Sequence, residues 1–187
     1  MVSKEQQRQR ATALIAQHLL AAGLSETSLR QLAGAAEVSD RMLLYYFTDK
    51  ADVILSALSH VVGAMTTLLA SAIPENANLS PKDLIAKALD VTQGDAMRPY
   101  MRLWIEIVAA AARGEQPYKS VSSQIALGFL AWIDSRLAGE ASDAKRATAA
   151  MAFAIIDGIA LLDVCAGQDQ SKLAISALTE LAFPSQS

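Results

Sequence analysis

Cysteine, histidine, proline and aromatic residues are scarce in this chain of 187 residues. It contains one cysteine, two histidines, five prolines and 5% aromatic residues. The single cysteine, Cys165, excludes an internal disulfide and a thiolate zinc site, and it fits a reducing compartment. Few prolines and glycines beside many alanines favour helices over strands. No segment alternates apolar and polar residues as a half-exposed strand does. We therefore predict an all-α protein.

The motifs of common enzyme and metal sites are also missing. The sequence has no G-x-S-x-G nucleophile elbow, no phosphate-binding glycine loop and no H-E-x-x-H motif. His18 and His60 are the only histidines, so a histidine-rich metal cluster is excluded. Asp157 and Asp163 are six residues apart, so they point to different sides of a helix and form a poor acid/base pair. We expect no enzymatic activity, no cofactor and no metal.

Two segments bear on localisation. The amino-terminal stretch MVSKEQQRQRATALIAQ lacks the apolar core and the cleavage site of a signal peptide. Residues 147–166 form the longest apolar run, but they include Asp157 and Asp163, and a central aspartate costs about 2.5–3.5 kcal/mol in an inserted helix. We therefore predict a buried helix rather than a membrane span, in a cytoplasmic protein with no membrane partner.

Capping residues, glycines and helical periodicity predict nine helices, three in an amino-terminal group and six behind it. Thr27 or Ser28, then Ser39 and Asp49, are suited to cap the second, third and fourth helices. The expected helices are 4–22, 29–36, 40–47, 50–72, 81–93, 96–113, 117–137, 142–165 and 171–182. We predict one small domain over residues 1–50 and a larger helical domain over residues 51–187.

The second and third helices form a helix-turn-helix pattern, in which the second helix of the pair enters the major groove of DNA. Leu43 and Phe47 are four residues apart and would anchor the third helix to the core. Asp40, Arg41 and Tyr45 would then face away from the core, together with Leu44. An apolar inner face and an outer face with arginine and tyrosine suit binding to DNA.

This stretch, TSLRQLAGAAEVSDRMLLYYFTDK, resembles the DNA-binding signature of the TetR family of transcriptional regulators. The resemblance covers about the first fifty residues, and the remainder matches only in length and number of helices. It implies a helix-turn-helix DNA-binding domain over residues 1–50 and an effector-binding and dimerisation domain over residues 51–187. It also implies a homodimer that binds an operator with an inverted repeat and responds to a small-molecule effector. The positions that match in order are Thr27, Leu32, Ala33, Ala36, Val38, Ser39, Leu43, Tyr45, Phe47 and Lys50.

Three positions depart from the family pattern. Glu37 stands where glycine is usual in the turn, and a left-handed conformation there would cost about 1–2 kcal/mol. Leu44 replaces a common tyrosine, and Tyr46 replaces a frequent histidine. Asp40 either accepts from a cytosine amino group or only favours the positive end of its helix. These departures support one alternative, a helical interaction module whose helix-turn-helix does not bind DNA.

The predicted DNA-binding residues are those on the outer face and at the helix starts, where hydroxyls, backbone N–H groups and cations meet phosphates. They are Thr27, Ser28, Arg30, Ser39, Asp40, Arg41, Met42, Leu44, Tyr45, Tyr46 and Lys50.

The fourth to seventh helices contain large, adaptable side chains. The family resemblance implies that these side chains line a pocket for a mostly apolar effector with one polar group. Packing within the core is the alternative for the same residues. The predicted lining is Met65, Leu69, Tyr100, Met101, Trp104, Ile105, Phe129 and Trp132.

The eighth helix is apolar on nearly all sides, so it must be covered on more than one side. The family resemblance implies a four-helix bundle made by the eighth and ninth helices of two subunits. The alternative is that both helices pack only within their own subunit. The predicted interface consists of Ala150, Ala154, Ile155, Gly158, Leu161, Leu162, Leu178 and Leu181.

Overall fold

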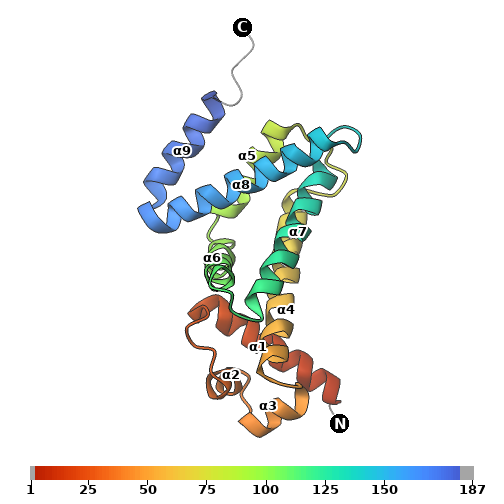
Figure 1. Ribbon diagram of the computed structural model, residues 1–187, viewed down its shortest axis with the longest axis vertical. Coiled ribbons are helices and arrows are strands. Elements are labelled where there is room, and N and C mark those ends of the chain that lie inside the picture. Colours follow the sequence, from red (N-terminus) through yellow and green to blue (C-terminus); the bar gives the residue numbers. More distant parts are fainter. Residues whose placement is uncertain (1–2, 182–187) are drawn as a thin grey trace. The chain divides into compact units, whose positions relative to one another are not determined.

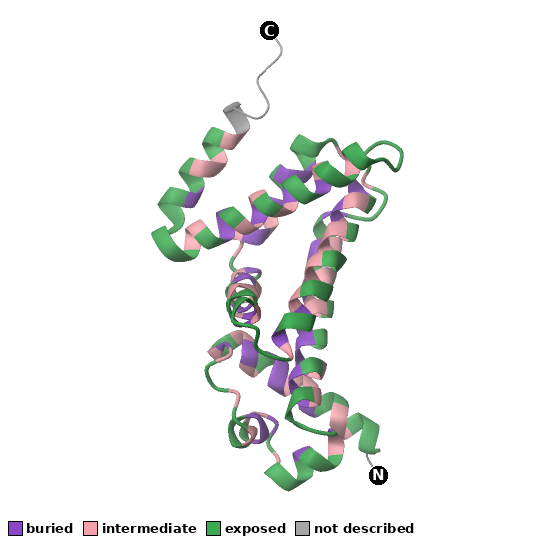
Figure 2. Cartoon of the chain, in the orientation of Figure 1, coloured by how far each residue is buried: buried purple, intermediate pink, exposed green. Residues whose placement is uncertain are grey.

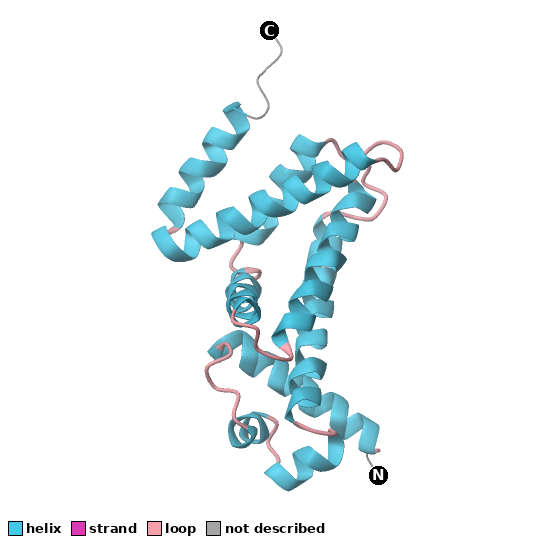
Figure 3. Ribbon diagram, viewed as in Figure 1, coloured by secondary structure: helices cyan, strands magenta, loops and turns pink. Residues whose placement is uncertain are grey.

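The computed structural model describes residues 3–181, with side-chain surroundings for residues 3–178. This part of the chain consists of nine α-helices and the loops between them (Figure 3), and the predicted all-α class is confirmed. An isolated β-bridge joins Leu79 and Leu137. The helices, labelled in Figure 1, are α1 (Lys4–Ala22), α2 (Leu29–Ala35), α3 (Asp40–Tyr46), α4 (Lys50–Ala72), α5 (Pro81–Gln93), α6 (Arg98–Ala112), α7 (Tyr118–Arg136), α8 (Asp143–Ala166) and α9 (Gln168–Leu181).

The chain forms two compact units. The first unit consists of residues up to 66 together with residues 102–123, and the second consists of residues 67–101 together with those from 124 onward. Helices α4, α6 and α7 each contribute residues to both units. The domain boundary predicted between residues 50 and 51 stays a prediction.

In the first unit, α1, α2 and α3 pack against one another around a small apolar core. Ile15 and Leu19 of α1, Leu32 of α2 and Leu43 of α3 are each 0% exposed, and Phe47 is 2% exposed. Ser28 caps α2 in a reciprocal capping box with Gln31, which satisfies two backbone N–H groups at the helix start. Of the two predicted caps for α2, Ser28 is therefore the one that acts.

In the second unit, the apolar core lies between α5 and α8, with the carboxyl ends of α4 and α7 beside it. Arg136, at the end of α7, is buried, and its Nε donates to the Ile73 carbonyl at 2.8 Å. Its guanidinium also lies over the Trp132 ring at 4.0 Å. Burial lowers the pKa of Arg136 from its ordinary value, against the opposing effect of the Glu75 carboxylate. The arginine thus supplies a donor to a backbone carbonyl at the carboxyl end of α4, where carbonyls lack partners within the helix.

The start of α9 differs from the prediction. The helix begins at Gln168, directly after Gly167 ends α8 with a positive φ of 87°. Ser171, where the helix was expected to start, is 0% exposed. Its hydroxyl lies 3.1 Å from Asp163 Oδ1 and 3.0 Å from the Gln168 carbonyl. Ser171 therefore links α9 to α8 from within the helix. The predicted end at Ala182 lies outside the described residues.

Helices α4 and α8 are long and apolar enough to cross a membrane by length and composition alone. This is weak evidence, because core helices of soluble proteins satisfy the same test. Helix α8 buries Ala149, Ala152, Ile156, Ile159 and Ala160 against the second unit. Only 28% of the apolar window of α8 is buried in the single chain, so the predicted burial applies to one side of the helix.

Candidate DNA-binding site

The sequence of α3 separates an anchored face from an exposed face. Leu43 and Phe47 are buried, as predicted, while Leu44 is 46% and Tyr45 is 58% exposed. Arg41 is exposed as well, and Figure 2 shows most of α3 as exposed. The Ser39 hydroxyl accepts from the Met42 N–H at 3.2 Å and caps the helix. Helix α3 therefore presents Arg41, Leu44 and Tyr45 outward from a fixed backbone.

The amino end of α1 supplies a cation to this face that the sequence pattern did not predict. The ammonium nitrogen of Lys4 lies 4.3 Å from the centre of the Tyr45 ring, a cation–π contact. The Tyr45 and Tyr46 rings meet edge to face, with centroids 5.6 Å apart. Lys4 thus adds positive charge beside the exposed tyrosine. No motif links the start of α1 to α3, so sequence alone carried no signal for this contact.

The turn between α2 and α3 adopts the left-handed conformation at Glu37 that was expected from the sequence to be unfavourable. Glu37 has a positive φ of 59°, the left-handed region where the family pattern has glycine. Its carboxylate pairs with Arg10 of α1 at 2.5 Å. The Val38 N–H donates to the Ala33 carbonyl at 3.0 Å, which closes the end of α2. The turn is therefore made with the geometry of a glycine turn, although a glutamate occupies it.

The start of α4 is tied to α1 by a part-buried network. Asp52 accepts from the Thr48 N–H at 2.9 Å and from Arg8 Nη2 at 2.9 Å. The guanidinium of Arg8 also lies over the Phe47 ring, 5.0 Å from its centre. The predicted cap Asp49 accepts from the Asp52 N–H at 2.8 Å. These contacts hold the first turn of α4, where the exposed Lys50 is the first residue.

The loop between α1 and α2 is held by α6 and α7 within the same unit. A carboxylate oxygen of Glu106 accepts from the Leu24 N–H at 2.6 Å. The Thr27 hydroxyl donates to the Leu24 carbonyl at 3.1 Å, and burial raises the pKa of Tyr118 against the lowering effect of the Thr27 side chain. A cavity of about 760 Å³ lies beside this loop, lined by residues that include Thr27, Lys50, Glu106 and Tyr118. Thr27, a predicted DNA contact, therefore also makes contacts within its own unit.

The remaining predicted DNA-binding residues are accessible. Ser28, Arg30, Ser39, Asp40 and Met42 are exposed, and Tyr46 is half-buried. The Ser28 and Ser39 hydroxyls already accept from backbone N–H groups at the starts of α2 and α3, so any contact with a phosphate would have to share them.

The predicted effector residues are mostly buried or half-buried. Met65, Leu69 and Met101 are 9%, 3% and 5% exposed, and the other five are half-buried. The indole nitrogen of Trp132 is buried and, within residues 3–178, has no hydrogen-bond partner. The predicted lining stays a prediction, but Trp132 offers an unused donor to a bound molecule.

The predicted dimer residues of α8 lie on its exposed side or at its margin. Ala150, Ala154 and Gly158 are exposed, Leu161 is 50% exposed, and Ile155 and Leu162 are half-buried. Leu178 of α9 is half-buried, and the side chain of Leu181 lies outside the described residues. The neighbouring Met151 and Val164 are 49% and 51% exposed. Helix α8 therefore carries an uncovered apolar face in the single chain.

No protein-family model matches the chain, and no curated protein matches it. Solved structures do. A transcriptional regulator from Rhodococcus sp. Rha1 aligns over 92% of this chain and 96% of its own, with a TM-score of 0.70 and 17% identity. A Rhodococcus sp. protein assigned to the TetR family of transcriptional regulators aligns over 92% and 96%, with a TM-score of 0.71 and 18% identity.

This chain has the fold of TetR-family transcriptional regulators. The multidrug binding protein EbrR, in complex with proflavin, is a further structure with this fold; it covers 92% of this chain and 99% of its own, with a TM-score of 0.64 and 22% identity. The TetR-like fold extends over nearly the whole chain, whereas the sequence resemblance was confined to about the first fifty residues. Helices α2 and α3 of this fold are the pair predicted from the sequence as a helix-turn-helix, and the DNA contacts of α3 stay a prediction.

Proposed function

We propose that this chain is a ligand-responsive transcriptional regulator of the cytoplasm. It binds a palindromic operator as a homodimer, acts as a repressor, and leaves the operator when it binds a mostly apolar small molecule. The observation that carries the proposal is the anchored helix α3, with Leu43 and Phe47 buried and Arg41 and Tyr45 exposed on the opposite side. A fixed helix with an accessible arginine is what direct readout of a major groove requires.

Homodimerisation is supported by the uncovered face of α8. Ala150, Ala154 and Gly158 are small and exposed, so a second helix can approach closely, and Met151 and Leu161 add apolar area beside them. Two-fold symmetric packing of this face buries the same residues of both subunits. A two-fold dimer also places two copies of α3 on successive major grooves, which is the reason for an operator with two half-sites.

The effector proposal rests on the predicted lining and on one donor. Tyr100, Met101, Trp104 and Phe129 are large and adaptable, which suits an apolar molecule. The unpartnered Trp132 indole N–H supplies the single polar contact. A protein of the same fold, EbrR, is known in complexes with proflavin and malachite green. We propose that this chain likewise responds to an aromatic or otherwise apolar compound that carries a hydrogen-bond acceptor.

Selection from random duplexes tests the proposal. The full-length protein is incubated with a library of random double-stranded DNA at low salt, and bound duplexes are sequenced over several rounds. We expect an inverted repeat whose half-sites are separated by about one helical turn or a multiple of it. Enrichment of no inverted repeat would contradict DNA binding and favour the interaction module.

That alternative function has one observation in its favour. Leu44 is 46% exposed at the centre of the outward face, where the family pattern has a tyrosine. An exposed leucine contributes more to a protein contact than to a phosphate contact. Substitution Leu44→Tyr separates the two functions, because it should strengthen operator binding if α3 enters DNA and should weaken a contact made with a protein.

A further inference from the structure

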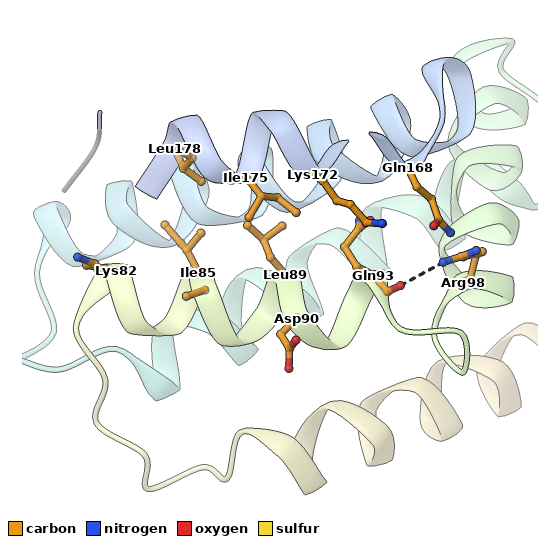
Figure 4. A pocket seen from close by; sticks show the side chains of 11 residues that line it. Lys82, Ile85, Leu89, Asp90, Gln93, Arg98, Gln168, Lys172, Ile175 and Leu178 are labelled. Carbon is orange, nitrogen blue, oxygen red and sulfur yellow. Dashed lines mark hydrogen bonds between the residues drawn. The ribbon is translucent and has the colours of Figure 1, made fainter. Parts of the chain in front are cut away.

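A groove between α5 and α9 lies in the second unit, and its lining includes none of the residues predicted to bind the effector. Its volume is about 320 Å³, which is within the range of small-molecule sites. Figure 4 shows that Ile85 and Leu89 on α5 face Leu178 and Ile175 on α9 across the groove. The floor between the two helices is therefore apolar.

Cations lie at the ends of this apolar floor. Arg98 and Lys172 lie at one end, beside the amides of Gln93 and Gln168, and Lys82 lies at the other end (Figure 4). The carboxylate of Asp90 also borders the groove, but Figure 4 shows it directed away from α9. Arg98 and Lys172 make their end of the groove attractive to an anion.

The guanidinium of Arg98 is held in place at its end of the groove. Its Nη2 donates to the Gln93 carbonyl at 3.3 Å. With the Gln168 amide turned so that its oxygen faces the arginine, that oxygen accepts from both Nη atoms at 2.5 Å. The only acid paired with Arg98 in the described residues is Asp95, at 3.4 Å with a side chain that is 98% exposed, so the charge is weakly neutralised. The positive end of α9, which begins at Gln168, adds to the potential at this point.

We propose that the groove between α5 and α9 binds a carboxylate that carries a medium-length apolar chain. The carboxylate lies between Arg98 and Lys172, and the chain extends along Leu89, Ile175 and Ile85. An amphipathic anion can pair its charge with the cations and cover the apolar floor with its chain. An inorganic anion would leave the apolar floor exposed to water, and an apolar cation would be repelled by Arg98 and Lys172. The site is separate from the effector residues proposed above, because none of those eight residues lines it.

Isothermal titration of the full-length protein with decanoate tests the proposal, with butyrate and decyltrimethylammonium as comparison ligands. We expect decanoate to bind, and butyrate and decyltrimethylammonium to bind at least about tenfold more weakly, since one lacks the apolar chain and the other the negative charge. Lys172→Glu should weaken decanoate binding by about tenfold, since it replaces an attraction by a repulsion near the carboxylate. The matched control Lys87→Glu makes the same change at an exposed lysine of α5 that does not line the groove, and it should change affinity by less than about twofold.

Four outcomes would overturn the proposal. One is an absence of decanoate binding, and another is equal binding of decyltrimethylammonium. The third is decanoate binding that Lys172→Glu leaves unchanged but Trp104→Ala abolishes, which would assign the ligand to the effector residues. Sedimentation of Lys172→Glu must also match that of the parent protein; dissociation into monomers would assign the groove to a second copy of the chain. Operator binding is measured separately, so failure of the groove leaves the proposed regulator intact.

Discussion

Arg10 and Glu37 form an ion pair at 2.5 Å that joins α1 to the turn of the helix-turn-helix. The pair forms at a residue with a positive φ of 59°, where a side chain is normally unfavourable. Both side chains are well exposed, at 65% and 63%, so the pair contributes at most about 1 kcal/mol. That contribution offsets part of the cost of the left-handed backbone, which is about 1–2 kcal/mol.

Two substitutions at Glu37 separate the backbone from the ion pair. Glu37→Ala removes the pair and keeps a side chain in the left-handed region, whereas Glu37→Gly removes the pair and relieves the backbone. We expect the glycine variant to be more stable than the alanine variant by about 1 kcal/mol in urea unfolding. Equal stabilities, or a more stable alanine variant, would mean that the turn carries no strain at Glu37.

Arg41 and Lys50 should affect operator binding in different ways. Arg41 lies on the outward face of α3, so Arg41→Ala should lower the preference for the operator over other sequences by about 1–3 kcal/mol. Lys50 starts α4, so Lys50→Ala should weaken binding to all duplexes and reduce the slope of log affinity against log salt by about one, because one phosphate is no longer neutralised. Fluorescence anisotropy on operator and scrambled duplexes over a salt series measures both effects. Identical behaviour of the two variants would contradict the assignment of α3 to base readout.

The contact between Glu106 and the Leu24 N–H should stabilise the loop before α2. Glu106→Gln keeps an acceptor oxygen, while Glu106→Ala leaves the Leu24 N–H without this part-buried partner, at a cost of about 1–3 kcal/mol. Hydrogen exchange of the Leu24 amide should therefore be faster in the alanine variant and nearly unchanged in the glutamine variant. Unchanged exchange in both variants would show that the loop is held by other contacts.

Gly23 provides an independent test of the same contact. Its φ is 70°, and an added Cβ would clash with the carboxylate of Glu106. Gly23→Ala should therefore destabilise the protein by about 2 kcal/mol or more, through backbone strain and displacement of Glu106. The double variant Gly23→Ala with Glu106→Ala removes the clash and retains the strain, so the two effects on the free energy of unfolding should be less than additive.

Local signals in the sequence predicted the helices well. Ser28 and Ser39 cap helices because their hydroxyls reach backbone N–H groups only three residues away. The burial of Leu43 and Phe47 follows from helical spacing in the same way. Contacts between distant segments carried no such signal. The distances from Lys4 to Tyr45, from Glu106 to Leu24 and from Arg136 to Ile73 depend on how helices approach one another, which periodicity does not encode.

The two candidate sites differ in the same way, because one depends on local signals and the other on contacts between distant segments. The outward residues of α3 could be predicted because one helix and its anchors define them. The groove between α5 and α9 could not, because Leu89 and Ile175 look like ordinary core residues in their own helices. Their facing positions become visible only when the helices are placed in space.

A charge on the exposed face of α8 should prevent dimer formation. Ala154 is exposed in the single chain, so Ala154→Glu should fold as a monomer but leave an unpaired carboxylate if the face is buried between subunits. Analytical ultracentrifugation at micromolar concentration should give a dimer for the parent protein and a monomer for this variant. The control Ala131→Glu places the same charge on an exposed position of α7 and should leave the dimer intact. A parent protein that sediments as a folded monomer would contradict the proposed operator geometry.

The last prediction links effector binding to DNA binding through α4, which is continuous from Lys50 to Ala72. Met65 lies fifteen residues after Lys50, about 22 Å along the helix axis at 1.5 Å per residue. A packed helix moves largely as a rigid body, so a molecule held against Met65 can displace Lys50 and change the separation of the two α3 helices in a dimer. By linkage, an effector that prefers the non-binding arrangement lowers operator affinity by its own affinity ratio, about 5–150-fold.

We expect apolar compounds with one hydrogen-bond acceptor, found by a thermal-shift screen, to release the operator. Trp104→Ala should blunt release and leave operator binding intact, with Trp104→Phe as a milder change if the alanine variant is unstable. Trp132→Phe removes the buried indole N–H and keeps an aromatic ring, so it should weaken only ligands that carry the acceptor. Compounds that bind near Trp132 and leave operator affinity unchanged would refute coupling through α4, because a ligand with equal affinity for both arrangements cannot shift their populations.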